Sequence, residues 1–332
     1  MKLLIIGGTV FLGRHFVEQA LAKGHEVTLF NRGLHNAHLF PEAEKIHGDR
    51  QGDLSVLAGR NWDAVVDFCG YVPREVRAMA ELLAGSVDHY TFVSSISVFS
   101  DHSKSNDENG PLGTLEDETV EEVTGETYGP LKALCEQAAE AAMPGRVCTV
   151  RPGLIVGPHD PSDRFTYWPH RVAQGGEVLA PGDPAKRVQI MDGRDLAGWM
   201  LDMVERKDTG IYNATGPDIP LTMGDVLEEC RAAAGNTATL TWVSEEFLIE
   251  EEVGGWMEMP LWLPDSEEYA GFNTVDCSKA IAHGLRFRPI SDIVRATLAW
   301  DATLPPEREL HAGMKREREE ELLAKWSSVA QN

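Results

Sequence analysis

The N-terminal segment constrains the fold of this chain more than any other stretch of its sequence. Four apolar residues, Leu3 to Ile6, lead directly into Gly7 and Gly8, and from Phe11 to Leu21 the pattern becomes helical. The apolar run predicts a strand that is buried on both faces. Such a strand, a glycine turn and a helix N-terminus together form a site for a pyrophosphate, because the backbone N–H groups and the helix dipole both favour an anion there. Taken alone, the turn is weak evidence, since a Gly-Gly turn after a strand can be only a turn.

Apolar strands and helices continue to alternate along the first half of the chain. Strands are predicted at 26–30, 45–49, 63–67, 89–93 and 147–150, and helices at 73–84 and 128–142. This alternation predicts an α/β fold, a doubly wound parallel sheet of the Rossmann type. We therefore expect a dinucleotide-binding domain over residues 1–153. A smaller C-terminal α/β substrate domain is expected over 154–332, with some segments that return to the first sheet.

Glycine, proline and tryptophan become denser after residue 153, and the pattern is less regular. Helices are predicted at 192–204, 222–234 and 315–325, and a strand with a turn at 212–216. Thr222 is expected to cap the second of these helices. The charged tail helix is interpreted as a solvated face.

Two further segments leave alternatives open. The polar stretch 100–126 is either a mobile loop near the mouth of an active site or a disordered segment. Trp256 and Trp262, in the aromatic segment 242–272, could line a ligand pocket or pack the smaller domain. Packing is the expected role for most of these rings.

Composition narrows the classes of partner and compartment. The net charge of −23 disfavours a protein that binds nucleic-acid phosphates non-specifically. No apolar run reaches membrane-spanning length and the N-terminus lacks a signal-peptide pattern, so a cytoplasmic protein with no membrane partner is expected. The five scattered cysteines predict free thiols, and His35, His38 and His47 show no metal-ligand spacing, so no metal site is predicted.

The strongest chemical signal combines Tyr128 and Lys132 with Ser94 and Ser95 at the end of an earlier predicted strand. A Tyr and a Lys four residues apart on a helix lie on one face, so the ammonium can lower the pKa of the phenol from its usual value of about 10. The tyrosine can then exchange a proton with a substrate oxygen while a hydride moves to or from a nicotinamide. A nearby serine hydroxyl can stabilise the developing charge. Pro130 is tolerable if it lies in the first turn of the helix.

Together these motifs resemble the extended short-chain dehydrogenase/reductases, the NAD-dependent epimerase/dehydratase group, over nearly the whole chain. The resemblance depends on motifs in the family's order: Gly7 to Gly13, Gly48-Asp49, Val93 to Phe99, Tyr128 to Lys132, Arg151 to Pro158 and Gln189 to Ala197. It implies Ser95, Tyr128 and Lys132 as the catalytic residues. It also implies cofactor contacts from Gly7, Thr9, Val10, Phe11, Leu12, Gly13, Asn31, Arg32, Asp49, Arg50, Cys69, Gly70 and Lys132. For Arg151, an ion pair within the fold and a contact with the ligand are both considered.

Departures from the family pattern bear on the choice of cofactor. Val10 replaces the middle glycine of the turn and can fit only with a negative φ. Asn31 stands where family members that select NAD usually have an acidic residue, and Arg32 follows it. Since an arginine can pair with a 2′-phosphate, we predict NADP as the cofactor, with NAD as the alternative.

The turn also resembles an atypical branch of the family that includes chloroplast stem-loop RNA-binding proteins and bacterial reductases. The leading hypothesis is an NAD(P)-dependent oxidoreductase or epimerase acting at a secondary alcohol or ketone, with nucleotide sugars among the candidate substrates. The alternative is a catalytically silent dinucleotide-binding module, a sensor or an RNA-associated protein. A small-molecule carbonyl or alcohol substrate, no nucleic acid and a possible homodimer are the expected partners. The loops 153–190 and 240–275 are expected to form the substrate pocket.

Overall fold

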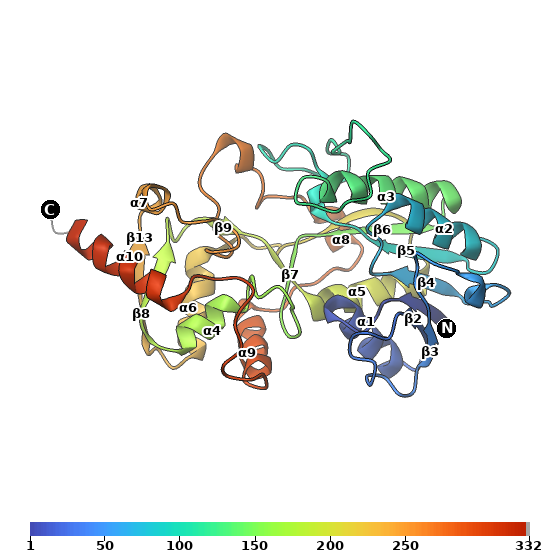
Figure 1. Ribbon diagram of the computed structural model, residues 1–332, viewed down its shortest axis with the longest axis horizontal. Coiled ribbons are helices and arrows are strands. Elements are labelled where there is room, and N and C mark those ends of the chain that lie inside the picture. The colour runs from blue at the N-terminus through green and yellow to red at the C-terminus, as the bar shows by residue number, and fades with distance from the viewer. Residues whose placement is uncertain (330–332) are drawn as a thin grey trace.

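Seven parallel strands form the central sheet of residues 1–329, the part of the chain that the computed structural model describes (Figure 1). Their order is β11-β6-β5-β4-β1-β2-β3, so the strand order reverses at β1. Ile6 at the end of β1 lies level with Phe30 of β2 and Asp67 of β4, which brings the carboxyl ends of these strands to one edge. The predicted doubly wound sheet is confirmed, and ligands bind such sheets at the edge where the order reverses. The strands are β1 (Lys2–Ile6), β2 (Glu26–Asn31), β3 (Glu44–His47), β4 (Ala64–Asp67), β5 (His89–Val93), β6 (Val147–Pro152) and β11 (Gly210–Ala214).

Helices cover both faces of this sheet (Figure 1). On one face α1 (Phe11–Ala22) packs against α5 (Gly193–Arg206), and on the other α2 (Pro73–Leu83) packs against α3 (Tyr128–Ala142). Side chains of β1 alternate between the two cores: Leu3 and Ile5 face α1 and α5, and Leu4 and Ile6 face α2 and α3. Each fully buried aliphatic side chain contributes on the order of 2 kcal/mol. The continuous apolar run therefore reflects burial on both faces, as predicted.

Most predicted elements occur within two residues of their expected bounds. The helix at 128–142 is found as expected, and Pro130 lies in its first turn, where its missing N–H is tolerated. Strand β3 ends at His47, earlier than predicted. At the next residue, Gly48, an added Cβ would lie only 2.5 Å from the Phe30 ring, so the chain passes tightly over that ring.

The second lobe has its own core, made by helices around a pair of parallel strands, β8 and β13 (Figure 1). Thr222 caps α6 in a capping box with Asp225, which confirms the predicted cap. Trp168 and Trp262 are buried here, so Trp262 packs the core. The main elements are α4 (Tyr167–Ala173), β8 (Gly176–Pro181), α6 (Met223–Ala233), β13 (Ala238–Val243), α9 (Ile290–Asp301) and α10 (Arg316–Val329). Shorter elements are β7 (Leu154–Val156), β9 (Arg187–Val188), β10 (Ile190–Asp192), β12 (Leu221–Thr222), α7 (Glu245–Glu250) and α8 (Ser278–Ala282), with 3₁₀ turns at Ser55–Leu57, Ile96–Val98 and Glu267–Tyr269.

The tail helix α10 is not simply a solvated face, which corrects the prediction. Leu322 and Leu323 are buried against the second lobe. Glu319 is 1% exposed and pairs with the buried Arg171 at 2.6 Å. It also accepts a hydrogen bond from the Leu179 N–H at 3.0 Å, so this charged helix is fixed by one buried carboxylate.

The polar segment 100–126 connects the two lobes. The carbonyl of Glu108 accepts a hydrogen bond from Arg151 at 3.0 Å, and its carboxylate accepts one from the Asn213 N–H at 3.0 Å. The carbonyl of His102 accepts one from the N–H of Gly271 at 2.8 Å. These bonds hold the segment to β6, to β11 and to the 271–276 loop.

The five cysteines are free thiols, as predicted; four are buried and Cys69 is partly buried. Over the described residues, no helix combines the length and apolar character needed to cross a bilayer.

Candidate active site

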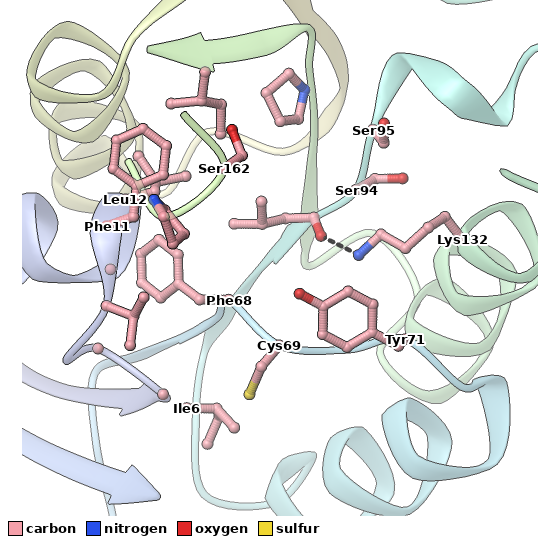
Figure 2. A pocket seen from close by; sticks show the side chains of 18 of the residues that line it. Ile6, Phe11, Leu12, Phe68, Cys69, Tyr71, Ser94, Ser95, Lys132 and Ser162 are labelled. Atoms are coloured by element: carbon pink, nitrogen blue, oxygen red, sulfur yellow. Dashed lines mark hydrogen bonds between the residues drawn. The ribbon is translucent and has the colours of Figure 1, made fainter. Parts of the chain in front are cut away.

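A pocket of about 690 Å³ opens at the carboxyl edge of the sheet, between the two lobes. Figure 2 shows side chains that converge on it from the glycine turn, from β4 and β5 and from α3. Its size is typical of small-molecule and cofactor sites. The predicted site residues that line it are Gly7, Thr9, Val10, Phe11, Leu12, Gly13, Asn31, Arg32, Asp49, Arg50, Cys69, Ser95, Tyr128 and Lys132.

Gly70 was predicted to contact the cofactor but does not line the pocket. It is buried, and an added Cβ would lie 2.6 Å from Phe92 and 2.7 Å from Val76. Its carbonyl oxygen accepts a hydrogen bond from Lys132 at 2.7 Å. Gly70 therefore acts through its carbonyl oxygen, which holds the Lys132 side chain, and does not border the pocket itself.

The glycine turn closes tightly onto the start of α1. Gly7 and Gly8 have φ values of 98° and 88°, a region that glycine adopts without strain. Val10 has a φ of −128°, the negative value that its branched side chain requires, and the positive φ falls instead on Phe11 at 38°. Among the residues that the structure describes, no side chain caps α1, and no acidic residue occupies its first turn. Its first N–H groups are therefore available to an anion, and the turn fits a dinucleotide pyrophosphate.

Asn31 fixes the turn to the end of β2. Its Nδ2 donates to the carbonyl of Gly7 at 2.9 Å, and its Oδ1 accepts from the N–H of Gly33 at 2.9 Å. A carboxylate here could not donate to Gly7, so the amide of Asn31 has a structural role, and it leaves the end of β2 without an acidic side chain. Arg32, the next residue, is exposed at the pocket and has no ion-pair or hydrogen-bond partner within residues 1–329.

Arg50 lines the pocket, but its guanidinium is bound to Asp67. The two side chains form a pair of hydrogen bonds at 2.8 and 2.9 Å, and Asp67 is fully buried. The Tyr90 hydroxyl also donates to Asp67, at 2.8 Å. Burial opposes ionisation of Asp67, yet the charge and hydrogen bonds of Arg50 keep its pKa below the usual value. This network supports the loop that carries Cys69. Burial raises the pKa of the Cys69 thiol to about 11.

Asp49 lines the pocket with its carboxylate. Within residues 1–329, its Oδ1 accepts only the Gln51 N–H, at 3.0 Å.

Lys132 extends from α3 into the pocket and binds backbone oxygens (Figure 2). Its Nζ donates to the carbonyls of Gly70 at 2.7 Å and Val93 at 2.6 Å, and lies 4.4 Å from the centre of the Phe92 ring. Burial lowers the pKa of Lys132 to about 8. Since an ammonium has three N–H groups, one donor remains for a ligand.

The sequence predicts that Lys132 lowers the pKa of Tyr128, but in the structure other groups determine this pKa. Burial raises this pKa, and the groups that lower it are a hydrogen bond from Ser95 and the charge of Arg164, not Lys132. The ammonium of Lys132 is instead held by the carbonyls of Gly70 and Val93. The hydroxyl of Ser95 lies 3.0 Å from that of Ser97, so its single proton can go to that oxygen or to the phenol.

The neighbouring Ser94 is occupied elsewhere, which agrees with the choice of Ser95. Its hydroxyl donates to Glu136 at 2.5 Å, inside the fold. Glu136 in turn forms a buried ion pair with Arg151 at 2.7 Å. Of the two roles considered for Arg151, the structure shows the ion pair within the fold.

The second lobe closes the other side of the pocket. Its lining residues come from 152–164, Gln189, Trp256 and 272–273, within or next to the loops predicted to form the substrate pocket. Trp256 therefore lines the pocket while Trp262 packs the core. Asp160 and Arg164 are the charged members of this wall, and nothing in the sequence distinguishes them from residues of an ordinary polar loop. None of residues 100–126, all of which the structure describes, lines the pocket. Across the described chain no cluster of His, Cys, Asp and Glu side chains could hold a metal ion.

The glycine turn, the uncapped start of α1 and the Ser95, Tyr128 and Lys132 side chains lie around one pocket, the arrangement expected of a short-chain dehydrogenase. Residues 3–215 match the NAD dependent epimerase/dehydratase family, and the chain belongs to this family of enzymes. The predicted resemblance is thereby confirmed.

Solved structures with the same fold include nucleotide-sugar epimerases. UDP-glucuronic acid 4-epimerase from Bacillus cereus, solved with NAD, has a TM-score of 0.66 and 16% identity, covering 91% of this chain and 99% of that one. UDP-glucose 4-epimerase from Bifidobacterium longum, solved with NAD⁺ and UDP, has a TM-score of 0.64 and 19% identity, covering 92% and 99%. At identities this low, the structural similarity establishes only that this chain has the same fold as these epimerases.

Two relatives in sequence lie outside the sugar epimerases. The chloroplast stem-loop binding protein of 41 kDa b from Arabidopsis thaliana is 23% identical over 267 residues, and the photosystem II assembly factor Ycf39 from Trieres chinensis is 34% identical over 115 residues. The matches cover 70% and 30% of this chain, but only 63% and 35% of those proteins. The first agrees with the resemblance to the atypical branch.

Proposed function

We propose that this chain is an NADP(H)-preferring oxidoreductase or epimerase that transfers a hydride at a secondary alcohol or ketone. The observation that carries the proposal is the arrangement of Ser95, Tyr128 and Lys132 around the pocket that also contains the glycine turn. The bound nicotinamide would supply or accept the hydride. Tyr128 would give its phenolic proton to the carbonyl oxygen in reduction, or remove the hydroxyl proton in oxidation. Ser95 would donate a hydrogen bond to the same substrate oxygen.

In this proposal, Lys132 binds the ribose of the cofactor. Its two bonds to the carbonyls of Gly70 and Val93 fix the ammonium, and the third N–H is free to bind a ribose hydroxyl. Asp49 is proposed to contact the adenosine half of the cofactor, because its carboxylate lines the pocket near the end of β3.

Arg32 supports the preference for NADP. It is an exposed guanidinium at the pocket with no partner among residues 1–329, directly after the position where an acidic residue would favour the ribose of NAD. A charge-assisted bond to a 2′-phosphate contributes about 1.5–3 kcal/mol, which corresponds to roughly ten- to a hundredfold in affinity.

Turnover tests the chemistry, with ketones given to the NADPH-loaded enzyme, and secondary alcohols and nucleotide sugars given to the NADP⁺-loaded enzyme. Tyr128→Phe should abolish turnover while the dissociation constant for NADPH changes by less than about threefold, because the phenol oxygen is the only group removed. Surviving turnover would refute the role of Tyr128.

Separate titrations with NADP and NAD test the cofactor preference. Arg32→Gln should weaken NADP binding by about tenfold or more and leave NAD binding unchanged. Tighter binding of NAD by the wild-type protein would refute the preference.

The alternative of a catalytically silent, RNA-associated module is not favoured. One relative is named for stem-loop binding, but this chain has a net charge of −23. A gel shift with a stem-loop RNA should show no salt-dependent complex.

A further inference from the structure

The basic side chains that line the pocket differ in whether the protein already binds their charged groups. Arg50 is paired with Asp67, and Lys132 is bonded to two carbonyls. Within residues 1–329, Arg32 and Arg164 are the pocket-lining arginines that lack a carboxylate partner. Arg32 follows β2, whereas Arg164 belongs to the wall of the pocket that the second lobe contributes. Arg32 is placed to bind the 2′-phosphate of the cofactor. Arg164 is therefore available to bind a different anion.

The guanidinium of Arg164 is held in a fixed plane. Its Nε donates to the Ser162 hydroxyl at 3.2 Å, and its guanidinium carbon lies 5.6 Å from the centre of the Trp256 ring. Ser162 is among the pocket residues drawn in Figure 2. In the part of the chain that the structure describes, neither terminal nitrogen of Arg164 has a protein acceptor, and the residue borders the cavity. A fixed fork with free terminal N–H groups is complementary to a carboxylate or a phosphate.

Asp160 offers an acceptor in the same wall of the pocket. Its residue is 2% exposed, and its Oδ1 accepts from the Ser162 N–H at 2.8 Å. Its Oδ2 is buried and has no hydrogen-bond partner among the described residues. Buried carboxylate oxygens are normally satisfied, so this oxygen is suited to a hydroxyl group of a ligand.

Arg164 and Tyr128 line the same pocket. Burial raises the pKa of Tyr128, and the charge of Arg164 opposes this effect. Burial lowers the pKa of Arg164 itself, and the charge of Asp160 opposes that change. An anion bound by Arg164 would therefore occupy the same pocket as the Tyr128 phenol.

We propose that Arg164 binds a carboxylate or phosphate group of a hydroxylated substrate, and that Asp160 Oδ2 accepts a hydrogen bond from a neighbouring substrate hydroxyl. This inference rests on the proposed function, whose substrate class it narrows from any secondary alcohol or ketone to acidic ones.

Calorimetric titration of the NADP-loaded enzyme with glucose, glucuronate and glucose 6-phosphate tests the proposal. The three probes share a hydroxylated ring and differ in the anionic group, so they also distinguish a carboxylate from a phosphate. At least one acidic probe should bind about tenfold or more tightly than glucose. Arg164→Gln should reduce this ratio to about one, and Arg164→Lys should retain part of it, because the charge remains while the fork is lost. Asp160→Asn should weaken glucose binding, because the carboxylate acceptor is lost, but should not lower the ratio of acid to glucose affinity, because it also removes a negative charge that acts on Arg164.

Two control variants separate this inference from the proposed function. Arg32→Gln, at the other unpaired arginine, should weaken NADP binding but keep the acid-to-glucose ratio once the cofactor is saturating. Tyr128→Phe should lose turnover and keep the ratio, so anion binding can hold even if the chemistry fails. The proposal is overturned if the wild-type protein does not prefer an acidic probe, including the case in which no probe binds. It is also overturned if Arg164→Gln keeps the preference.

Discussion

The contact between Gly13 and Gly8 gives a sharp test of the dinucleotide site. A Cβ added at Gly13 would lie 2.9 Å from the Cα of Gly8 and 3.1 Å from its N, closer than such atoms approach. Both are backbone atoms of the turn, so no side-chain rotation can relieve the clash. Gly8 is in turn packed against Ile5 and Leu29, toward which its own Cβ would point at 2.9 and 3.0 Å.

Two opposing terms set the magnitude for Gly13→Ala. Overpacking at a rigid contact costs about 1–3 kcal/mol. Alanine within α1 recovers about 1 kcal/mol over glycine through helix propensity. The free energy of unfolding should therefore fall by up to about 2 kcal/mol, and NADP binding should weaken by about tenfold or more because the turn moves away from the helix N-terminus.

Gly85→Ala is the matched control. No atom lies within 4 Å of an added Cβ there, and the backbone has no positive φ. This variant should be unchanged or more stable by up to about 1 kcal/mol. Urea unfolding followed by circular dichroism, with calorimetric titration of NADP, measures both quantities. If Gly13→Ala matches Gly85→Ala in stability and in NADP affinity, the close contact does not shape the site.

Three further predictions follow from single side chains. Burial lowers the pKa of Lys132 from 10.5 to about 8, so between these values the folded state binds fewer protons than the unfolded state and stability should rise with pH, by at most about 1.4 kcal/mol per unit. Urea midpoints across this range should show that slope in the wild-type protein and lose it in Lys132→Met. Ser95→Ala removes a hydrogen bond that lowers the pKa of Tyr128, so the pH profile of turnover should shift to higher pH; an unshifted profile would contradict the contact. Glu319→Gln leaves its buried arginine partner without a counter-charge and should lower the free energy of unfolding by about 3 kcal/mol, while Glu321→Gln on the exposed side of α10 should leave the urea midpoint unchanged.

Local features of this site could be predicted from the sequence. Tyr128 and Lys132 are four residues apart on a helix, and the glycine turn follows a buried strand, so each depends on neighbours in the chain. The doubly wound parallel sheet could be predicted from the alternation of apolar strands and helices, but its strand order could not be read from that pattern.

Partners distant in the sequence could not be predicted. Arg50 was expected at the cofactor, but Asp67, 17 residues away, binds its guanidinium. The cation near Tyr128 that lowers its pKa is Arg164 from another lobe, not Lys132 on the same helix. Such pairings depend on how separate elements pack, and residue spacing carries no record of that packing.

The two unpaired arginines bind anions in a protein whose net charge slows the arrival of anions. The protein has a net charge of −23, so its long-range field repels NADP and any acidic substrate, the opposite of electrostatic steering. Added salt screens this repulsion beyond a Debye length of about 10 Å, whereas contacts within the pocket are screened much less. Association rates measured by stopped-flow should therefore rise with ionic strength, while dissociation rates change little. Anions would then be selected by the short-range geometry of two guanidinium groups, because the overall charge of the molecule opposes the approach of any anion.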